Sequence, residues 1–246
     1  MISFSKIKTN PSYLNVDCDE VKINKGDKVA IIGANGSGKT SLINAITGLI
    51  KSENDITKEI TNSEIGYLMQ KVSLPNDLFV RELLELVLID NKNVGDENVD
   101  KLLNKKVKVL SGGELQYLML YLITSLDKEI YFFDELTTGL DSSKRKYVLD
   151  NLINKKLETF CLVTHYVEEA IKVCNKILIM NEGNVVLYGE ISELLEKKEM
   201  NYKITRNGET MYFKTIEDAK KEELESDLIS KCDLKDLLSV CGVDCE

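Results

Sequence analysis

The chain has 246 residues, of which 43% are hydrophobic and 30% are charged, a composition typical of soluble globular proteins. This length allows one sizeable α/β domain with an appendage, or two small domains. The net charge of −9 argues against nucleic acid as the main partner. The N-terminal residues lack the apolar core of a signal peptide, and no run approaches the ~18 apolar residues that span a bilayer. We therefore expect no direct membrane span, so any membrane role would belong to a partner chain.

Residues 2–32 are predicted to form strands, and the last of these leads into a glycine-rich loop. Val29 to Ile32 form a short apolar run that is typical of a buried strand, and a helix is expected after Thr40. Between them, residues 33–40 fit the phosphate-binding pattern G-x-x-x-x-G-K-[ST]. Glycines allow backbone N–H groups to close on a phosphate, and the N-terminus of the helix points more N–H groups at the same place.

This loop predicts a nucleotide site with Mg²⁺. Lys39 is expected to reach the β- and γ-phosphates, and the Thr40 hydroxyl is expected to ligate the metal. The residues predicted to bind the nucleotide here are Asn35, Gly36, Ser37, Gly38, Lys39, Thr40 and Ser41.

Between the loop and the middle of the chain, the pattern predicts a polar segment, a strand and two helices. The segment 51–64 is polar, and a strand at 65–69 ends in Gln70. Apolar positions three and four apart predict a helix over 78–89, and another over 112–125.

Strands and helices alternate after residue 130. Apolar runs at 130–133 and 160–163 predict buried strands, which end at Asp134-Glu135 and at Thr164-His165. Helices are expected from Asp141 and over 167–173, and strands over 176–180 and 184–188. This alternation favours an α/β fold with a mostly parallel sheet flanked by helices.

The C-terminal residues predict a small extra module. Residues 201–213 carry Arg206-Asn207-Gly208 between alternating segments, which indicates a hairpin, and an acidic helical tail is expected over 217–240. The six cysteines are expected to be free thiols, although a metal or redox site in the tail is an alternative. They are Cys18, Cys161, Cys174, Cys232, Cys241 and Cys245.

Asp134 and Glu135 lie where open α/β sheets bind ligands, at the carboxyl end of a strand. Asp134 is expected to hold Mg²⁺ opposite Thr40. Glu135 is then placed to polarise the attacking water as a general base.

The stretch Leu110-Ser-Gly-Gly-Glu114 has two interpretations. Ser111 and Glu114 have the spacing of a capping box, which needs no ligand. Gly112 and Gly113 cost about 1 kcal/mol each within a helix relative to alanine, so close approach of an anion explains them better.

Together these motifs resemble the nucleotide-binding domain of an ATP-binding cassette (ABC) transporter, the ATP-binding subunit. The resemblance runs from about Tyr13 to Gly189, with the motifs in the order of the family. The matches are Walker A at 33–40, the Q-loop at Gln70, the signature at 110–114, Walker B with the catalytic glutamate at 130–135, the D-loop at 138–141 and the switch histidine at His165. The fold implied is a P-loop NTPase core with an antiparallel N-terminal β subdomain, a short helical subdomain and a small C-terminal α+β extension.

The resemblance also implies roles and partners. Glu135, His165 and Gln70 would be catalytic, Gln70 would also contact Mg²⁺, and Tyr13 would stack on the adenine of ATP. Ser111, Gly112 and Gly113 would contact the γ-phosphate bound by a paired nucleotide-binding subunit, or by the second copy in a homodimer.

The implied activity is ATP hydrolysis that drives a separate transmembrane permease from the cytoplasmic face of the cell membrane. The short chain and its small tail favour an exporter or a resistance/immunity-type system. The expected domains are 1–199, with the helical subdomain at about 72–125, and an extension over 200–246.

Two departures from the family pattern stand out. Leu136 replaces the usual proline, and Tyr117 replaces the usual arginine after the signature, which removes a charge from that helix. The alternatives are a soluble ABC ATPase of a cytosolic assembly, such as iron–sulfur cluster biogenesis, and a nucleotide-gated binding module with little turnover. An intact Glu135 and His165 argue against the latter.

Overall fold

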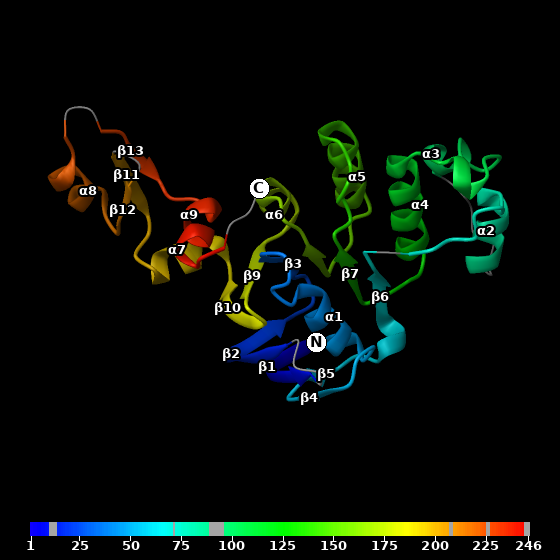
Figure 1. Cartoon of the computed structure of the whole chain (residues 1–246), viewed down its shortest axis with the longest axis horizontal. Helices are drawn as coiled ribbons and strands as arrows, with labels where there is room; N and C mark the ends of the chain where they lie inside the picture. The colour runs from blue at the N-terminus through cyan, green and yellow to red at the C-terminus, as the bar shows by residue number, and fades with distance from the viewer. Residues whose placement is uncertain (10–13, 71, 89–95, 207–208, 225–226, 244–246) are drawn as a thin grey trace.

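The computed structural model describes residues 1–9, 14–70, 72–88, 96–206, 209–224 and 227–243. The molecule is elongated (Figure 1): the core sheet lies in the centre, the helices from the middle of the chain lie at one end, and the C-terminal strands lie at the other. No helix in these ranges is long and apolar enough to cross a bilayer.

A six-stranded sheet in the order β10-β9-β3-β8-β7-β6 forms the core. Strands β9 to β6 run parallel, and only β10 is antiparallel. Every residue of β7 and β8 is buried because layers cover both faces of a parallel sheet, which explains their continuous apolar sequences. The bounds are β3 (Lys28–Gly33), β6 (Ile65–Leu68), β7 (Ile130–Asp134), β8 (Phe160–Val163), β9 (Lys176–Asn181) and β10 (Asn184–Gly189).

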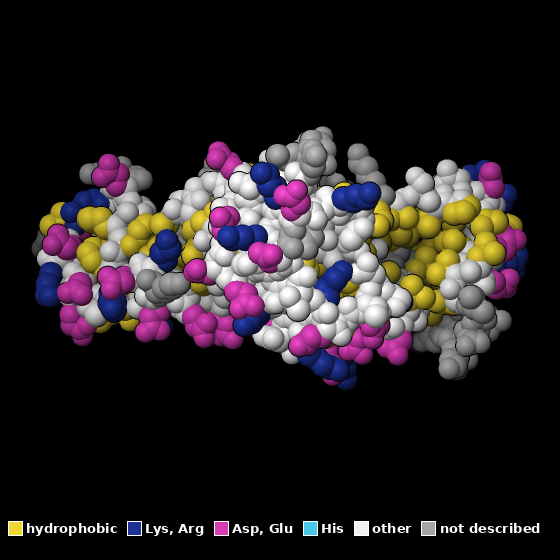
Figure 2. Space-filling model, turned by 90° about the horizontal axis from the view of Figure 1, so that it is seen from below, with side chains coloured by type: hydrophobic (Ala, Val, Ile, Leu, Met, Phe, Trp, Pro, Cys, Tyr) yellow, Lys and Arg dark blue, Asp and Glu magenta, His cyan; other side chains and the backbone are white. Residues whose placement is uncertain are grey.

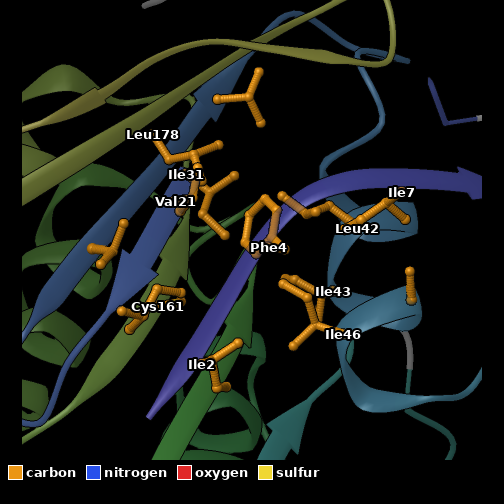
Figure 3. Packing of buried hydrophobic residues seen from close by; sticks show 14 of the residues in the cluster. Ile2, Phe4, Ile7, Val21, Ile31, Leu42, Ile43, Ile46, Cys161 and Leu178 are labelled. Atoms are coloured by element: carbon orange, nitrogen blue, oxygen red, sulfur yellow. The ribbon is translucent and has the colours of Figure 1, made fainter. Parts of the chain in front are cut away.

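An antiparallel sheet of N-terminal strands covers one side of this core. In β1, buried and more exposed positions alternate, as expected when only one face is packed. Figure 3 shows Phe4 and Ile7 of β1 facing Leu42 and Ile43 of the helix α1 (Lys39–Thr47). Helix α1 therefore contributes to the core cluster that this sheet shares with the central sheet. The strands are β1 (Ile2–Thr9), β2 (Asn15–Ile23), β4 (Ser52–Asn54) and β5 (Thr57–Lys58).

Helices cover the other layers of the core. Residues of α5 (Ser142–Asn154) pack with β7 and β8, and residues of α6 (Val167–Val173) and α7 (Ile191–Lys197) pack with β3 and β9. The helical part in the middle of the chain has its own apolar cluster. It contains α2 (Val80–Val87), α3 (Glu97–Asp100), the 3₁₀ turn Val107–Val109 and α4 (Gly112–Thr124).

The structure confirms the expected α/β fold and corrects two sequence predictions. The segment 51–64 is not merely polar: it contains β4, β5 and a 3₁₀ turn at Asn62–Glu64, because β4 and β5 pair with β1. The tail over 217–240 is not continuously helical. It contains α8 (Ile216–Glu222), β13 (Ile229–Lys231) and α9 (Leu234–Val240), because β13 pairs with β11 (Tyr202–Arg206).

The predicted hairpin is present as β11 and β12 (Glu209–Phe213), whose tip at 207–208 lies outside the described residues. Leu234 and Leu237 of α9 belong to the same apolar cluster as Val167 and Ala170 of α6. The C-terminal residues are thus joined to the core through α6. The division into residues 1–199 and 200–246 stays a prediction.

The cysteines within the described residues are free, and Cys161 is fully buried as a small apolar side chain. No group of three or more metal-ligating side chains forms among the described residues, where Cys232 and Cys241 are half-buried. Cys245 lies outside that part of the chain.

Candidate functional site

The phosphate-binding loop follows β3 and leads into α1. Gly36 and Gly38 have φ angles of 81° and 100°, in the left-handed region that glycine enters without strain. A Cβ on Gly33 would lie 2.3 Å from the carbonyl oxygen of Met180, so the backbone of β9 requires a glycine there. These glycines shape the turn that directs the N-terminus of α1 toward the loop.

Lys39 is bound to the loop that it follows. Its Nζ donates hydrogen bonds to the carbonyl oxygens of Gly33, at 2.8 Å, and Ala34, at 2.9 Å, and the residue is buried. The ammonium group therefore lies inside the glycine-rich loop, at the place where the sequence predicts phosphate.

Asp134, at the end of β7, faces the start of α1. The Thr40 hydroxyl donates to Asp134 Oδ2 at 2.8 Å, and the Tyr67 hydroxyl donates to the same oxygen at 3.4 Å. Asp134 Oδ1 is buried and has no hydrogen-bond partner among the described residues. Burial raises the pKa of Asp134, and the neighbouring charge of Glu135 adds to this increase. A cation beside this carboxylate would relieve that cost.

Glu135 is bound on both carboxylate oxygens. With its proton on Nε2, His165 donates to Oε1 at 2.9 Å, while Gln70 and Thr138 donate to Oε2. The backbone of Glu135 has φ 55°, which is uncommon for a residue with a side chain. The turn thus directs this side chain toward Thr138 in the same turn and toward Gln70 and His165 in two other segments.

These contacts set the protonation state of Glu135. Burial alone would raise the pKa of its carboxyl group, but the hydrogen bonds from His165 and Thr138 hold that pKa below its ordinary value. Glu135 is therefore ionised at neutral pH and can accept a proton.

The predicted residues around the loop line one cleft of 390 Å³. Ser37 is not among the lining residues: it is buried, and its hydroxyl has no hydrogen-bond partner within the described residues. Tyr13 lies outside the described residues. The cleft is lined by Asn35, Gly36, Gly38, Lys39, Thr40, Ser41, Gln70 and Glu135.

The three signature residues do not join this cleft. Ser111 and Gly113 line a different hollow of 360 Å³, between α4 and the start of α5. The capping-box interpretation of Ser111 and Glu114 is correct, because each side chain accepts a hydrogen bond from the other residue's backbone N–H, at 3.3 and 2.8 Å. A Cβ on Gly113 would lie 3.0 Å from Lys144 Cδ, a tight contact that a small shift of this exposed lysine side chain would relieve, so packing within the chain favours glycine there without requiring it.

Gly112 differs from Gly113. It is exposed, and a Cβ there would meet only Leu140 Cδ2, at an ordinary 3.6 Å. Nothing within the described chain requires a glycine at this position, so close approach of an anion remains the better explanation for Gly112.

Sequence reasoning missed three contributions to the site and its surroundings. Tyr67 binds Asp134 from a distant part of the sequence, and Thr138 binds Glu135 from three residues further along the same turn. Tyr117, where the family usually has arginine, is buried and donates a hydrogen bond to Asp96. The signature helix is thus linked to the loop before α3 without the usual positive charge.

The fold and the loop define a P-loop nucleotide-binding protein, and the comparisons identify its family. The family model described as ABC transporter matches residues 16–138. A putative ABC transporter ATP-binding protein of Pyrococcus furiosus is 30% identical over 72% of this chain and 78% of its own length. The chain belongs to the ABC transporter family.

Two other comparisons agree. A methionine import ATP-binding protein of Clostridioides difficile is 29% identical over 79% of this chain and 70% of its own length. The solved dimeric structure of an ATP-binding cassette bound to ADP and Pi shares the fold, with a TM-score of 0.63 and 23% identity over 77% of this chain and 98% of that one. This chain is an ABC transporter ATP-binding subunit, which binds ATP and couples its hydrolysis to transport.

Proposed function

We propose that this subunit pairs head to tail with a second nucleotide-binding subunit, hydrolyses Mg²⁺-bound ATP at the joint site and drives a separate membrane permease. The observation that carries this proposal is the division of the predicted ATP contacts between two separate hollows. Residues of the phosphate-binding loop line one hollow and signature residues line the other. Pairing with a second copy, whose signature would then face this loop, accounts for the two separate hollows.

Gly112 supports this pairing. Its exposed position has room for a side chain within the single chain, so the close approach that favours glycine must come from outside. The N-terminus of α4 would then offer its backbone N–H groups to the γ-phosphate held by the other subunit.

The residues beside the loop fit Mg²⁺. The buried Asp134 Oδ1 lacks a hydrogen-bond partner among the described residues, and the Thr40 hydroxyl binds Oδ2 of the same carboxylate. Hard oxygen donors of this kind are the ligands that Mg²⁺ prefers. Thr40 and Asp134 would therefore hold the metal, with Gln70 nearby, and the metal would neutralise charge on the phosphate oxygens.

Glu135 would act as the general base. Its carboxylate is ionised, and His165 holds Oε1 at 2.9 Å. Once Gln70 moves away from Oε2, that oxygen can accept a proton from a water molecule. Lys39 and the loop N–H groups would stabilise the charge on the γ-phosphate, and His165 would contact that phosphate.

An apolar groove next to Gln70 supports a permease partner. Met69, which immediately precedes Gln70, lines this 430 Å³ groove with Val72 and Val87, and all three side chains are exposed. Hydrophobic side chains gather over the end of the molecule that carries the middle helices (Figure 2). An amphipathic segment of the permease would lie here, and Gln70 would link its movement to Glu135.

Co-purification tests this proposal. The tagged chain should bring down a multi-span membrane protein from its own cells, on the cytoplasmic face of the membrane. Val87→Asp should abolish this association while ATP binding persists. Leu224→Asp, an exposed leucine of the C-terminal residues, is the matched control. If the wild-type chain brings down only a soluble complex, that result would contradict the proposal and favour a cytosolic assembly instead.

The direction of transport is a separate proposal. We propose an exporter or a resistance-type system, and the test has to separate this from import, because one similar protein is named as a methionine import subunit. Deleting the coding sequence should increase sensitivity to a toxic compound if the system exports. A new nutrient requirement without that sensitivity would identify an importer.

A further inference from the structure

Glu169, on the helix that follows the switch histidine, is a carboxylate that the reaction described above does not use. It lies in the first turn of α6 and is only 2% exposed. A buried carboxylate is costly unless its oxygens accept hydrogen bonds or it has a charged partner. The contacts of Glu169 therefore show which groups offset the cost of burying its carboxylate.

Both oxygens of Glu169 accept hydrogen bonds from buried threonine hydroxyls. Thr137 Oγ1 donates to Oε1 at 2.6 Å, and Thr164 Oγ1 donates to Oε2 at 2.5 Å. Thr137 comes two residues after Glu135, and Thr164 immediately precedes His165. One carboxylate thus joins the two backbone segments that carry the proposed base and its histidine partner.

A third segment approaches the same carboxylate. Arg145, in the first turns of α5, places Nε 3.8 Å from Glu169 Oε1, and its guanidinium stacks on the ring of Tyr166 at 3.4 Å from the centroid. Arg145 Nε is buried and has no hydrogen-bond partner among the described residues. Helix α5 begins directly after the D-loop, whose Asp141 caps its N-terminus.

We infer that Glu169 is a positioning residue: it holds the Glu135 and His165 segments in register and connects them to the D-loop helix through Arg145. The inference rests on the proposal that Glu135 is the base. The alignment between Glu135 Oε1 and His165 Nε2 depends on how β7 and β8 continue beyond the sheet, and Glu169 ties these two continuations together. The base would thereby respond to the D-loop, which the paired subunit would contact.

The neighbouring Glu168 provides a matched control. It lies on the same turn of α6, but it is exposed and pairs with Lys235 at the surface. The two glutamates therefore share helix, charge and volume, and they differ in what they touch.

The experiment compares ATP hydrolysis by Glu169→Ala, Glu169→Gln and Glu168→Gln, each purified as the full chain with the permease that accompanies it. Misplacing a base by about 1 Å can cost about 100-fold in rate, so we expect kcat of Glu169→Ala to fall by about 10- to 100-fold. The KM for ATP should stay within about twofold, because the phosphate-binding loop is untouched. Glu169→Gln, whose amide oxygen can still accept from one threonine hydroxyl while its NH2 group can only donate to the other, should recover part of the rate. Glu168→Gln should match the wild type.

A double-mutant cycle separates positioning from a general loss of structure. If Glu169 acts through Glu135, adding Glu169→Ala to Glu135→Gln should lower the residual rate no further. The inference would be overturned if Glu169→Ala lowered kcat by the same factor in the Glu135→Gln protein as in the wild type. It would also be overturned if a rise in the KM for ATP accounted for the loss of activity. Thr137→Val, a change of similar volume, tests the same link if Glu169→Ala does not fold, and an unchanged kcat in that variant would also refute it. If Glu135→Gln itself hydrolyses ATP normally, the proposed function fails instead.

Discussion

His165 Nε2 lies 2.9 Å from Glu135 Oε1, although 30 residues separate them in the chain. Strands β7 and β8 run parallel and side by side, with Asp134 paired to Val163, so their carboxyl ends deliver both residues to the same edge of the sheet. The contact fixes the carboxylate of Glu135, the proposed base, in the orientation that the following predictions test.

Glu135→Gln should bind ATP but hydrolyse it at least about 100-fold more slowly, because the amide cannot accept the proton of water. The phosphate-binding loop and the signature are unchanged in this variant, so it should accumulate as an ATP-bound dimer. Phosphate release measures the rate of hydrolysis, and light scattering of the protein eluted from a size-exclusion column measures the dimer. A variant that remains monomeric in saturating ATP would count against head-to-tail pairing.

His165→Ala should lower kcat and shift its pH dependence. The hydrogen bond from His165 is the largest of the effects that hold the pKa of Glu135 down, and burial raises that pKa, so losing the bond raises it. The base then remains protonated up to a higher pH, and the acid side of the kcat profile should move upward. His165→Gln, whose amide can donate in place of Nε2–H, should move it less. An unmoved acid limb in the alanine variant would show that another group controls it.

Gly112→Ala should separate folding from function. The new Cβ has room within the chain, and alanine favours the helix, so the melting temperature should stay the same or rise slightly. ATP-driven dimerisation and hydrolysis should be lost if a γ-phosphate approaches this backbone. Ile216→Ala, at the first position of α8, is the control and should keep both activities. Full activity of Gly112→Ala would remove the main support for the signature's proposed role.

Tyr117→Phe should destabilise the helical part. The Tyr117 hydroxyl is hydrogen-bonded to the Asp96 carboxylate, and losing a bond to a charged group costs about 1.5–3 kcal/mol. Urea unfolding followed by circular dichroism measures this change. Tyr212→Phe is the control, because the Tyr212 hydroxyl makes no hydrogen bond in the described part of the chain. Equal stability of the two variants would show that the Asp96 contact contributes little.

The phosphate-binding loop and the strand ends could be predicted because their signals are local. The loop requires glycines and Lys39 at fixed spacing, and the buried strands β7 and β8 are uninterrupted apolar runs that stop at Asp134 and at Val163. The short strands β4, β5 and β13 were missed because each is three residues or fewer. Their conformation depends on a partner strand, so their own residues carry little pattern.

By itself, the sequence determined the family, the loop, the order of the strands and helices of the core from β6 to β10, and the two carboxylates at the edge of the sheet. Those features depend on residues close together in the chain, where spacing alone dictates backbone geometry. Only the tertiary structure decided that Tyr67 binds Asp134, that Gln70 contacts Glu135, and that Glu169 joins the segments of Thr137 and Thr164. Thr164 lies only five residues before Glu169, but the partners in the other contacts are 32 to 67 residues apart, so their side chains meet only after the strands and helices that carry them have packed together.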